Sequence, residues 1–246
     1  MTAVLFIHGF PFDHLMWRHQ LAALTRWRCI APDLPGAGTS RGSKSADEFS
    51  MGSYADDLIA RLDGLQVGPA VVCGLSMGGY IVFELLRRFP ERIRAAVLLN
   101  TKAAADTPES KRGRDALAAT AQHSGAQAVA DELLPKVLAR ATLERQPAVV
   151  REVTEMILRQ PVSGLVGALR ALRDRPDSTP LLARIRVPVL VVAGDDDQIA
   201  PAAGMEEMAS AIRGAQYVLI PESGHLSPLE RPAAVNAALN AFLGQL

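Results

Sequence analysis

Six short runs of apolar residues recur along the chain, each followed by a turn-forming or polar segment. Apolar side chains occupy successive positions in these runs, which is typical of strands buried on both faces of a parallel sheet. The predicted strands are Val4–Ile7, Cys29–Ala31, Ala70–Cys73, Ala95–Leu99, Val187–Ala193 and Tyr217–Ile220.

Segments with the helical spacing of apolar residues lie between these strands. In Tyr54–Leu65, for example, Leu58, Ile59 and Leu62 share one stripe. The other predicted helices are His14–Leu24, Met77–Phe89, Met205–Ile212 and Ala233–Phe242. Alternating strands and helices predict an α/β fold with a mostly or fully parallel sheet.

The stretch Thr101–Thr179 interrupts this alternation, because it contains helical patterns but no strand pattern. Pro108, Pro147 and Pro161 each open a helix-like run, and proline is favoured at the first position of a helix. We therefore expect four helices that form a cap over the sheet. The predicted organisation is a core of residues 1–100 and 180–246 and a helical cap of residues 101–179.

Composition and charge indicate a folded globular protein and exclude several functional classes. Of the 246 residues 49% are hydrophobic, and 26 Lys and Arg residues balance 26 Asp and Glu residues. Interspersed charges that sum to zero argue against nucleic acid or an anionic membrane as a partner. Cys29 and Cys73 stand far apart, without the spacing of a disulfide framework or a zinc site. We see neither a signal peptide nor an apolar run of about 20 residues, and expect a cytoplasmic protein.

The strongest chemical signal is the sequence Gly74-Leu75-Ser76-Met77-Gly78, which stands between a predicted strand and a predicted helix. The pattern GxSxG in that context is typical of a nucleophile elbow, a sharp turn that exposes a serine hydroxyl above the sheet. The flanking elements favour this interpretation over a glycine-rich turn without a chemical role. Ser76 is therefore the candidate nucleophile.

A serine nucleophile needs a base, and five histidines are available. His225 follows the last predicted strand and precedes the last predicted helix, and loops at the carboxyl ends of parallel strands are where such sheets build their sites. His8 is better placed to shape a loop. His14, His19 and His123 lie in helical segments. His225 is thus the candidate base.

The base in turn needs a carboxylate that orients it. Asp195, Asp196 and Asp197 follow the predicted strand Val187–Ala193 and compete for this role. Because adjacent carboxylates repel one another, only one of them is expected to be buried against an imidazolium.

Taken together, these motifs resemble the α/β-hydrolase fold family, especially the small-cap subgroup of carboxylesterases, enol-lactonases and cofactor-free haloperoxidase-like perhydrolases. The resemblance covers almost the whole chain. It rests on the sequences HGFP at 8–11, PDLPGAG at 32–38 and GLSMGG at 74–79, on the aspartate loop and on Gly224-His225. The acid loop of the family reads GxxDxxxP, so Gly194 and Pro201 imply that Asp197 is the acid.

The family resemblance also implies an oxyanion hole and a departure in the sheet. The backbone N–H groups of Met77 and Phe10 would hold the oxyanion, and a tetrahedral intermediate needs two such donors. Members of the family usually carry a β-hairpin before the strand that leads to His-Gly, whereas this chain starts almost directly at that strand. We therefore expect a sheet of about six strands that lacks this hairpin.

The leading functional hypothesis is a serine hydrolase that cleaves small to medium carboxylic esters through an acyl-enzyme on Ser76, without metal or cofactor. A serine at position 76 does not fit the aspartyl-nucleophile branches, haloalkane dehalogenases and epoxide hydrolases. The expected partner is a small ester or lactone, and the oligomeric state stays open. Phe10, Phe12 and Trp17 are the expected aromatic contacts of the substrate, since the cap has no aromatic residue.

Other hypotheses remain. An enol-lactonase or a perhydrolase of the same fold is the nearest, and the absence of cap aromatics weakens the enol-lactonase reading. A lyase similar to hydroxynitrile lyases, with Lys102 stabilising charge, is more distant. A catalytically idle fold that binds a ligand is the alternative from another functional class.

Overall fold

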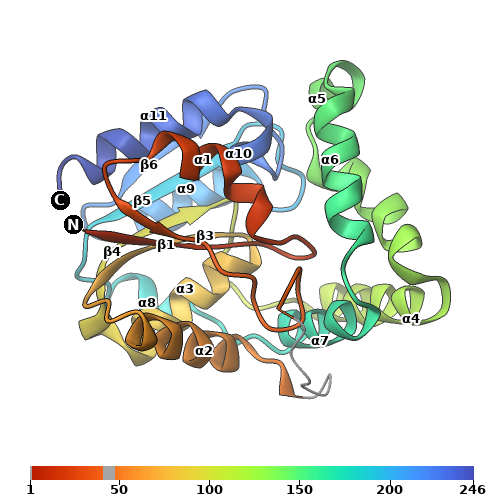
Figure 1. Ribbon diagram of the computed structural model, residues 1–246, viewed down its shortest axis with the longest axis horizontal. Coiled ribbons are helices and arrows are strands. Elements are labelled where there is room, and N and C mark those ends of the chain that lie inside the picture. The colour runs from red at the N-terminus through yellow and green to blue at the C-terminus, as the bar shows by residue number, and fades with distance from the viewer. Residues whose placement is uncertain (1, 41–47) are drawn as a thin grey trace.

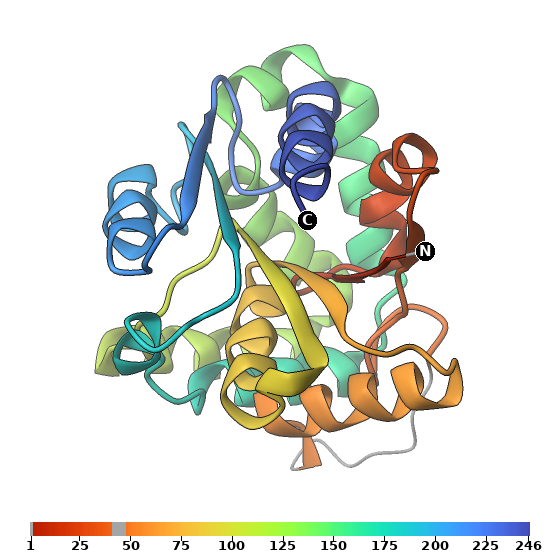
Figure 2. The same ribbon diagram turned by 90° about the vertical axis from the view of Figure 1, so that its left-hand side faces the viewer.

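A six-stranded sheet in which every pairing is parallel lies at the centre of the structure (Figures 1 and 2). The computed structural model describes residues 2–40 and 48–246; Met1 and residues 41–47, which the predicted core includes, lie outside the described residues. The order of the strands is β2-β1-β3-β4-β5-β6. Their bounds are Ala3–Ile7 for β1, Arg28–Ile30 for β2, Ala70–Leu75 for β3, Ile93–Leu99 for β4, Val189–Gly194 for β5 and Gln216–Ile220 for β6.

The sheet confirms the predicted fold, and burial explains the sequence pattern. All residues of β1, β3 and β5 are buried, because each strand has a neighbour on both sides and helices above and below. The edge strands β2 and β6 are partly exposed. The described strands are all parallel, so the expectation of six parallel strands without an antiparallel edge holds for residues 2–40 and 48–246.

Helices cover both faces of the sheet (Figure 1), with α1 and α11 on one face and α2 and α3 on the other. The bounds are Arg18–Ala23 for α1, Met51–Gly64 for α2, Met77–Arg88 for α3, Thr179–Leu182 for α8, Ala202–Ser210 for α9, Ser227–Glu230 for α10 and Pro232–Leu243 for α11. Short 3₁₀ turns lie at His14–Trp17 and Pro90–Arg92. No helix within the described residues combines the length and the apolarity that crossing a membrane requires.

Most of the segment between β4 and β5, from α4 to α7, lies beyond the carboxyl ends of the strands (Figure 1), whereas the short helix α8 that ends the segment does not. The bounds are Pro108–Val137 for α4, Arg140–Arg145 for α5, Pro147–Leu158 for α6 and Val162–Arg173 for α7. Thr107 caps α4 by accepting a 3.2 Å hydrogen bond from the N–H of Ser110. At Gly125 the backbone adopts φ = 73°, which bends α4 into two helical pieces. Helices α4–α7, called the cap below, fall within the predicted helical stretch 101–179, but the break at Gly125 divides α4 in two, so the expected number of four cap helices is not confirmed.

Candidate active site

Ser76 occupies a strained turn between β3 and α3. Its φ of 54° and ψ of −111° are unfavourable for a residue with a side chain, and such strain persists only where the surroundings impose it. The N–H of Ser76 donates to the carbonyl of Leu99 at 3.0 Å, and the Thr101 hydroxyl donates to the carbonyl of Ser76 at 2.8 Å. A Cβ atom on Gly78 would lie 2.1 Å from the carbonyl oxygen of Ile7, so only glycine lets the helix approach β1 this closely. Strand, strained turn and helix thus follow one another as a nucleophile elbow requires, and the role of Ser76 as nucleophile stays a prediction.

Asp197 and His225 lie in contact at the carboxyl ends of β5 and β6. Nδ1 of His225 is 2.8 Å from Oδ2 of Asp197, and both residues are buried. Burial alone would raise the pKa of Asp197, but the charge and hydrogen bond of His225, with further donors from Ala200 and Asn100, outweigh burial and hold this pKa below its ordinary value. Asp197 is therefore held as a carboxylate beside the imidazole.

Asn100 and Ser227 complete the surroundings of this carboxylate, and the sequence analysis did not single them out. Nδ2 of Asn100 donates to Oδ2 of Asp197 at 2.9 Å, and its Oδ1 accepts a 2.7 Å hydrogen bond from the hydroxyl of Ser227. The N–H groups of Ile199 and Ala200 donate to Oδ1 of Asp197 at 2.8 and 2.9 Å. The signal for Asn100 was its position directly after the buried strand β4, at the edge where parallel sheets gather functional groups.

The other two aspartates of the loop take different partners. Asp195 and Asp196 are exposed. Oδ1 of Asp195 accepts from the N–H of Ser223 at 3.1 Å, and Oδ2 of Asp196 accepts from the N–H of Arg140 at 3.0 Å. Of the three candidates, Asp197 is the one that the structure places against His225.

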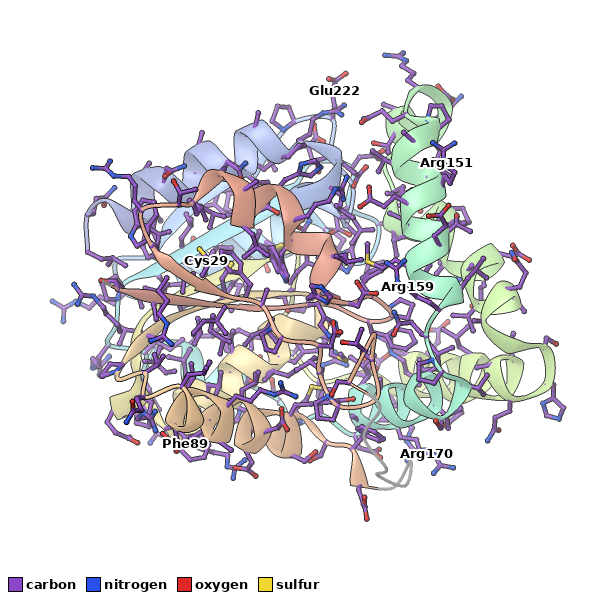
Figure 3. The ribbon with its side chains drawn as sticks, viewed as in Figure 1. Cys29, Phe89, Arg151, Arg159, Arg170 and Glu222 are labelled. Carbon is purple, nitrogen blue, oxygen red and sulfur yellow. The ribbon has the colours of Figure 1, made fainter. Side chains whose placement is uncertain are left out.

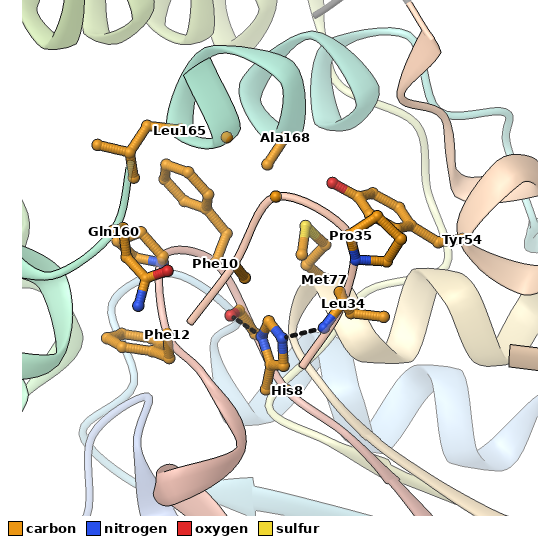
Figure 4. Close-up of a pocket in the computed structure, with 15 residues that line it drawn as sticks. His8, Phe10, Phe12, Leu34, Pro35, Tyr54, Met77, Gln160, Leu165 and Ala168 are labelled. Atoms are coloured by element: carbon orange, nitrogen blue, oxygen red, sulfur yellow. Dashed lines mark hydrogen bonds between the residues drawn. The ribbon is translucent and has the colours of Figure 1, made fainter. Parts of the chain in front are cut away.

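His8 ties together two loops beside Ser76. Its Nε2 accepts a 3.0 Å hydrogen bond from the N–H of Leu34, so Nδ1 carries the proton and donates to the carbonyl of Gly9 at 2.9 Å (Figure 4). Burial lowers the pKa of His8, which favours the neutral ring. Both ring nitrogens of His8 are thus engaged in loop structure.

Two further histidines lie away from the Asp197–His225 pair. Nδ1 of His14 is 2.7 Å from Oδ1 of Asp33, and His123 is exposed on α4, where its Nδ1 pairs with the carbonyl of Ala119. Asp13, His14 and Asp33 place potential ligand atoms within 4.8 Å of one another. Every carboxylate oxygen of the two aspartates already accepts a hydrogen bond from the protein. The cluster therefore holds neighbouring loops together.

The turn that carries Phe10 lies next to Ser76. A Cβ atom on Gly9 would lie 3.4 Å from the Cβ of Ser76. Met77 is the first residue of α3, where a helix leaves the N–H without an internal partner. Within residues 2–40 and 48–246, no acceptor is paired with the N–H of Phe10. Backbone donors of Phe10 and Met77 are thus available next to the Ser76 turn, and their role as an oxyanion hole stays a prediction.

A small apolar pocket opens between these loops and the cap (Figure 4). It encloses about 270 Å³ of empty space, counting its open mouth. Phe10, Phe12 and Met77 line it from the sheet side, and Leu165 and Ala168 of α7 line it from the cap. Phe10 and Phe12 thus line a pocket, and their contact with a substrate stays a prediction.

Gln160 is a polar side chain in the wall of this pocket, and its amide is already engaged (Figure 4). Oε1 accepts from the N–H of Gly38 at 2.8 Å, and Nε2 donates to the carbonyl of Met156 at 2.8 Å and to Oδ2 of Asp13 at 3.3 Å. Gln160 consequently links the end of α6 to two loops of the core. Arg159, labelled in Figure 3, strengthens the same link through a 2.8 Å ion pair with Asp13.

Trp17 and Lys102 lie elsewhere. Trp17 is fully buried, with its ring 5.1 Å from that of Phe6, and stands outside the set of residues that line the pocket. The sequence placed it near the site because it follows the HGFP loop closely, but the turn at His14–Trp17 rotates its side chain into the core. Lys102 lines a different groove, together with Leu182 and Met208.

Comparisons with known proteins agree with this geometry. The family model for the alpha/beta hydrolase fold matches residues 2–232. The chain is 28% identical over 242 residues to 3-oxoadipate enol-lactonase 2 of Acinetobacter baylyi, covering 98% of this chain and 88% of that protein. A thermophilic esterase from Thermogutta terrifontis superimposes with a TM-score of 0.96 at 37% identity, covering 100% of this chain and 90% of that one.

The enol-lactonase of Burkholderia xenovorans LB400 superimposes with a TM-score of 0.91 at 31% identity, over 99% of this chain and 91% of that one. Esterases and lactonases thus share this fold from end to end. With a family match that spans nearly the whole sequence, the chain belongs to the α/β-hydrolase fold family of enzymes.

Proposed function

We propose that the protein is a serine hydrolase that cleaves small to medium carboxylic esters through an acyl-enzyme on Ser76. His225 takes the proton of the Ser76 hydroxyl as that oxygen attacks the ester carbonyl, and then gives the proton to the departing alcohol. Water attacks the acyl-enzyme with His225 again as base. The observation that carries the proposal is the buried 2.8 Å contact between His225 and Asp197, at the same edge of the sheet as the strained Ser76 turn.

In this proposal Asp197 and the two backbone donors have separate roles. Asp197 holds Nδ1 of His225, so that proton exchange falls to Nε2, and it stabilises the imidazolium that forms. The N–H groups of Phe10 and Met77 stabilise the oxyanion, and one such donor typically contributes a factor of about 10² to 10³ to kcat. These steps use side chains and backbone groups of this chain alone.

The pocket favours a small uncharged acyl group. Apolar side chains such as Phe10, Phe12 and Leu165 form most of its wall, as is usual for ligand pockets. Among residues 2–40 and 48–246, the 15 that line it include neither lysine nor arginine, and Gln160 has its amide engaged by the protein. A carboxylate on the substrate would lose hydration here without gaining a lysine or arginine partner among the described lining residues.

An enol-lactonase is the second candidate, because enol-lactonases are among the relatives by sequence and by structure. A lactone is a cyclic ester, so the same acyl-enzyme chemistry applies. Within the part of the chain that the structure describes, no Lys or Arg lines the pocket, and this favours a neutral ester over an acidic lactone.

Two measurements test the proposal. A fluorophosphonate probe should add one label to the wild type and none to Ser76→Ala, as read by intact mass, and Ser76→Ala should lose ester turnover while its Tm stays near that of the wild type. A series of p-nitrophenyl esters of increasing acyl length, beside an acidic enol-lactone and an aminoacyl amide, should show the highest kcat/KM for short acyl chains. Turnover near the wild-type level in Ser76→Ala would refute the mechanism, and a maximum at the lactone would favour the second candidate.

A further inference from the structure

Glu230 is a buried carboxylate to which the proposed mechanism assigns no role. It ends the short helix α10, five residues beyond His225, and only 2% of it is exposed. Burial raises the pKa of Glu230, and hydrogen bonds to the carboxylate offset this only in part. A buried carboxyl group is costly unless its oxygens find donors, so the partners of Glu230 indicate what it does.

The two oxygens of Glu230 face two different parts of the fold. Oε1 accepts hydrogen bonds from the N–H groups of Gly224 and Leu226, at 3.0 and 3.2 Å. These two residues lie on either side of His225. Oε2 accepts from the N–H of Ala139 at 2.8 Å and from the hydroxyl of Thr142 at 2.7 Å, both in the cap. One carboxylate therefore joins the His225 loop to the segment between α4 and α5.

Other contacts bring the same cap segment against both loops of the Asp197–His225 pair. The N–H of His225 itself donates to the carbonyl of Val137 at 3.1 Å. A Cβ atom on Gly224 would lie 2.4 Å from the nitrogen of Ala139, so the two backbones touch. The N–H of Arg140 reaches Asp196, next to the acid. Residues 137–142 of the cap thus pack against both the loop that carries Asp197 and the loop that carries His225.

We propose that Glu230 is a positioning residue that clasps the His225 loop to cap residues 137–142, so that the seating of the cap and the alignment of His225 with Ser76 are coupled. The inference rests on the proposed function only in taking His225 as the base. Glu230 acts through the loop and does not touch the reacting atoms.

The substitution Glu230→Gln tests the clasp with little change in volume. An amide replaces one acceptor oxygen by a donor. If the NH₂ group faces the loop, it opposes the N–H groups of Gly224 and Leu226; if it faces the cap, it opposes the N–H of Ala139. Either orientation breaks one side of the clasp. Glu222→Gln is the matched control, because Glu222 carries the same group nearby but projects into solvent (Figure 3).

Thr142 allows a milder test from the cap side. Thr142→Val keeps the shape and removes the hydroxyl that donates to Oε2, whereas Thr142→Ser keeps the hydroxyl. We expect Thr142→Val to show the effect of Glu230→Gln in weaker form and Thr142→Ser to restore wild-type behaviour. If Glu230→Gln does not fold, the comparison of Thr142→Val with Thr142→Ser still tests whether the hydrogen bond to Glu230 positions His225.

Three readouts separate positioning from simple stability. In Glu230→Gln we expect kcat to fall by up to about 100-fold, the cost of a small misplacement of a catalytic group, with KM nearly unchanged, because the pocket is lined by other residues. The rate of fluorophosphonate labelling should fall in parallel. Hydrogen–deuterium exchange at the amides of Gly224 and Ala139 should quicken, while Glu222→Gln matches the wild type in all three.

The outcomes are distinguishable. Wild-type kcat and wild-type labelling rate in folded Glu230→Gln and Thr142→Val would overturn the inference, as would equal losses in Thr142→Val and Thr142→Ser. If the wild type itself takes no fluorophosphonate, the proposed function fails, and unchanged exchange at Gly224 and Ala139 in the variants would then overturn the clasp on its own.

Discussion

Nδ2 of Asn100 donates a 2.9 Å hydrogen bond to Oδ2 of Asp197, the same oxygen that contacts Nδ1 of His225. Asn100 directly follows β4 and Asp197 follows β5, so residues at the ends of two neighbouring strands hold the carboxylate between them. The hydroxyl of Ser227 fixes the amide of Asn100 in the orientation that points its NH₂ group at the acid. Asn100 therefore controls where the carboxylate stands relative to the imidazole.

We expect Asn100→Ala to lower kcat by about 10- to 100-fold. A hydrogen bond to a charged group contributes about 1.5–3 kcal/mol, and about 1.4 kcal/mol corresponds to a factor of ten in rate. Asn100→Asp should be worse, because it sets a second carboxylate against Asp197. Steady-state kinetics at constant pH measures both, with exposed Asn240→Ala as the control. Wild-type kcat in folded Asn100→Ala would show that the bond has no catalytic consequence.

The three aspartates of the acid loop should respond very differently to the same change. Asp197→Asn should reduce kcat by about 10⁴-fold, because an amide favours the wrong tautomer of the histidine. Asp195→Asn and Asp196→Asn should change kcat little, since both are exposed and accept single backbone hydrogen bonds. Parallel kinetics on the three variants tests the assignment. A severe defect in either of the exposed positions would contradict it.

Gly164 in α7 tests how tightly the cap rests on the core. A Cβ atom there would lie 1.8 Å from the carbonyl oxygen of Gly36, so Gly164→Ala must push α7 away from a loop that lines the pocket. We expect a loss of about 1–3 kcal/mol in the free energy of unfolding and a higher KM. Gly113→Ala in α4, where nothing lies within 4 Å of the new methyl group, should instead stabilise by about 0.5–1 kcal/mol. Equal shifts in Tm for both variants would refute the contact.

Asp33 should contribute to the pH dependence of stability. Burial opposes ionisation, but hydrogen bonds from His14 and Thr39 lower the pKa of Asp33 to about 2. Because this pKa lies below the ordinary value of 3.8, the contribution is complete above about pH 4 and is lost as the pH falls toward 2. Asp33→Asn should cost up to about 2 kcal/mol at pH 7 and only a small fraction of that near pH 2.

Urea unfolding at pH 7, 4 and 2.5 measures this difference. Asp57→Asn is the control, because Asp57 makes a surface ion pair with Arg61 and such pairs contribute at most about 1 kcal/mol. A constant difference between wild type and Asp33→Asn across this range would show that the carboxylate is not stabilised by its loop.

The element order, the parallel sheet and the elbow at Ser76 followed from the chain itself, because each depends on residues close together in sequence. Continuous apolar runs indicate strands with neighbours on both sides, and GxSxG between a strand and a helix has few structural solutions. The break at Gly125 escaped the periodicity, since a single glycine within a helical pattern does not reveal whether the backbone bends there.

Contacts between distant segments were decided only by the tertiary structure. Asn100 and Asp197 are 97 residues apart, and Thr142 and Glu230 are 88 residues apart, so no local pattern pairs them. The direction of Trp17 is likewise set by what packs around it. Apolar periodicity records whether a residue is buried, but the partner that a buried polar group finds depends on how the loops meet at the carboxyl edge of the sheet, and that is a property of the whole fold.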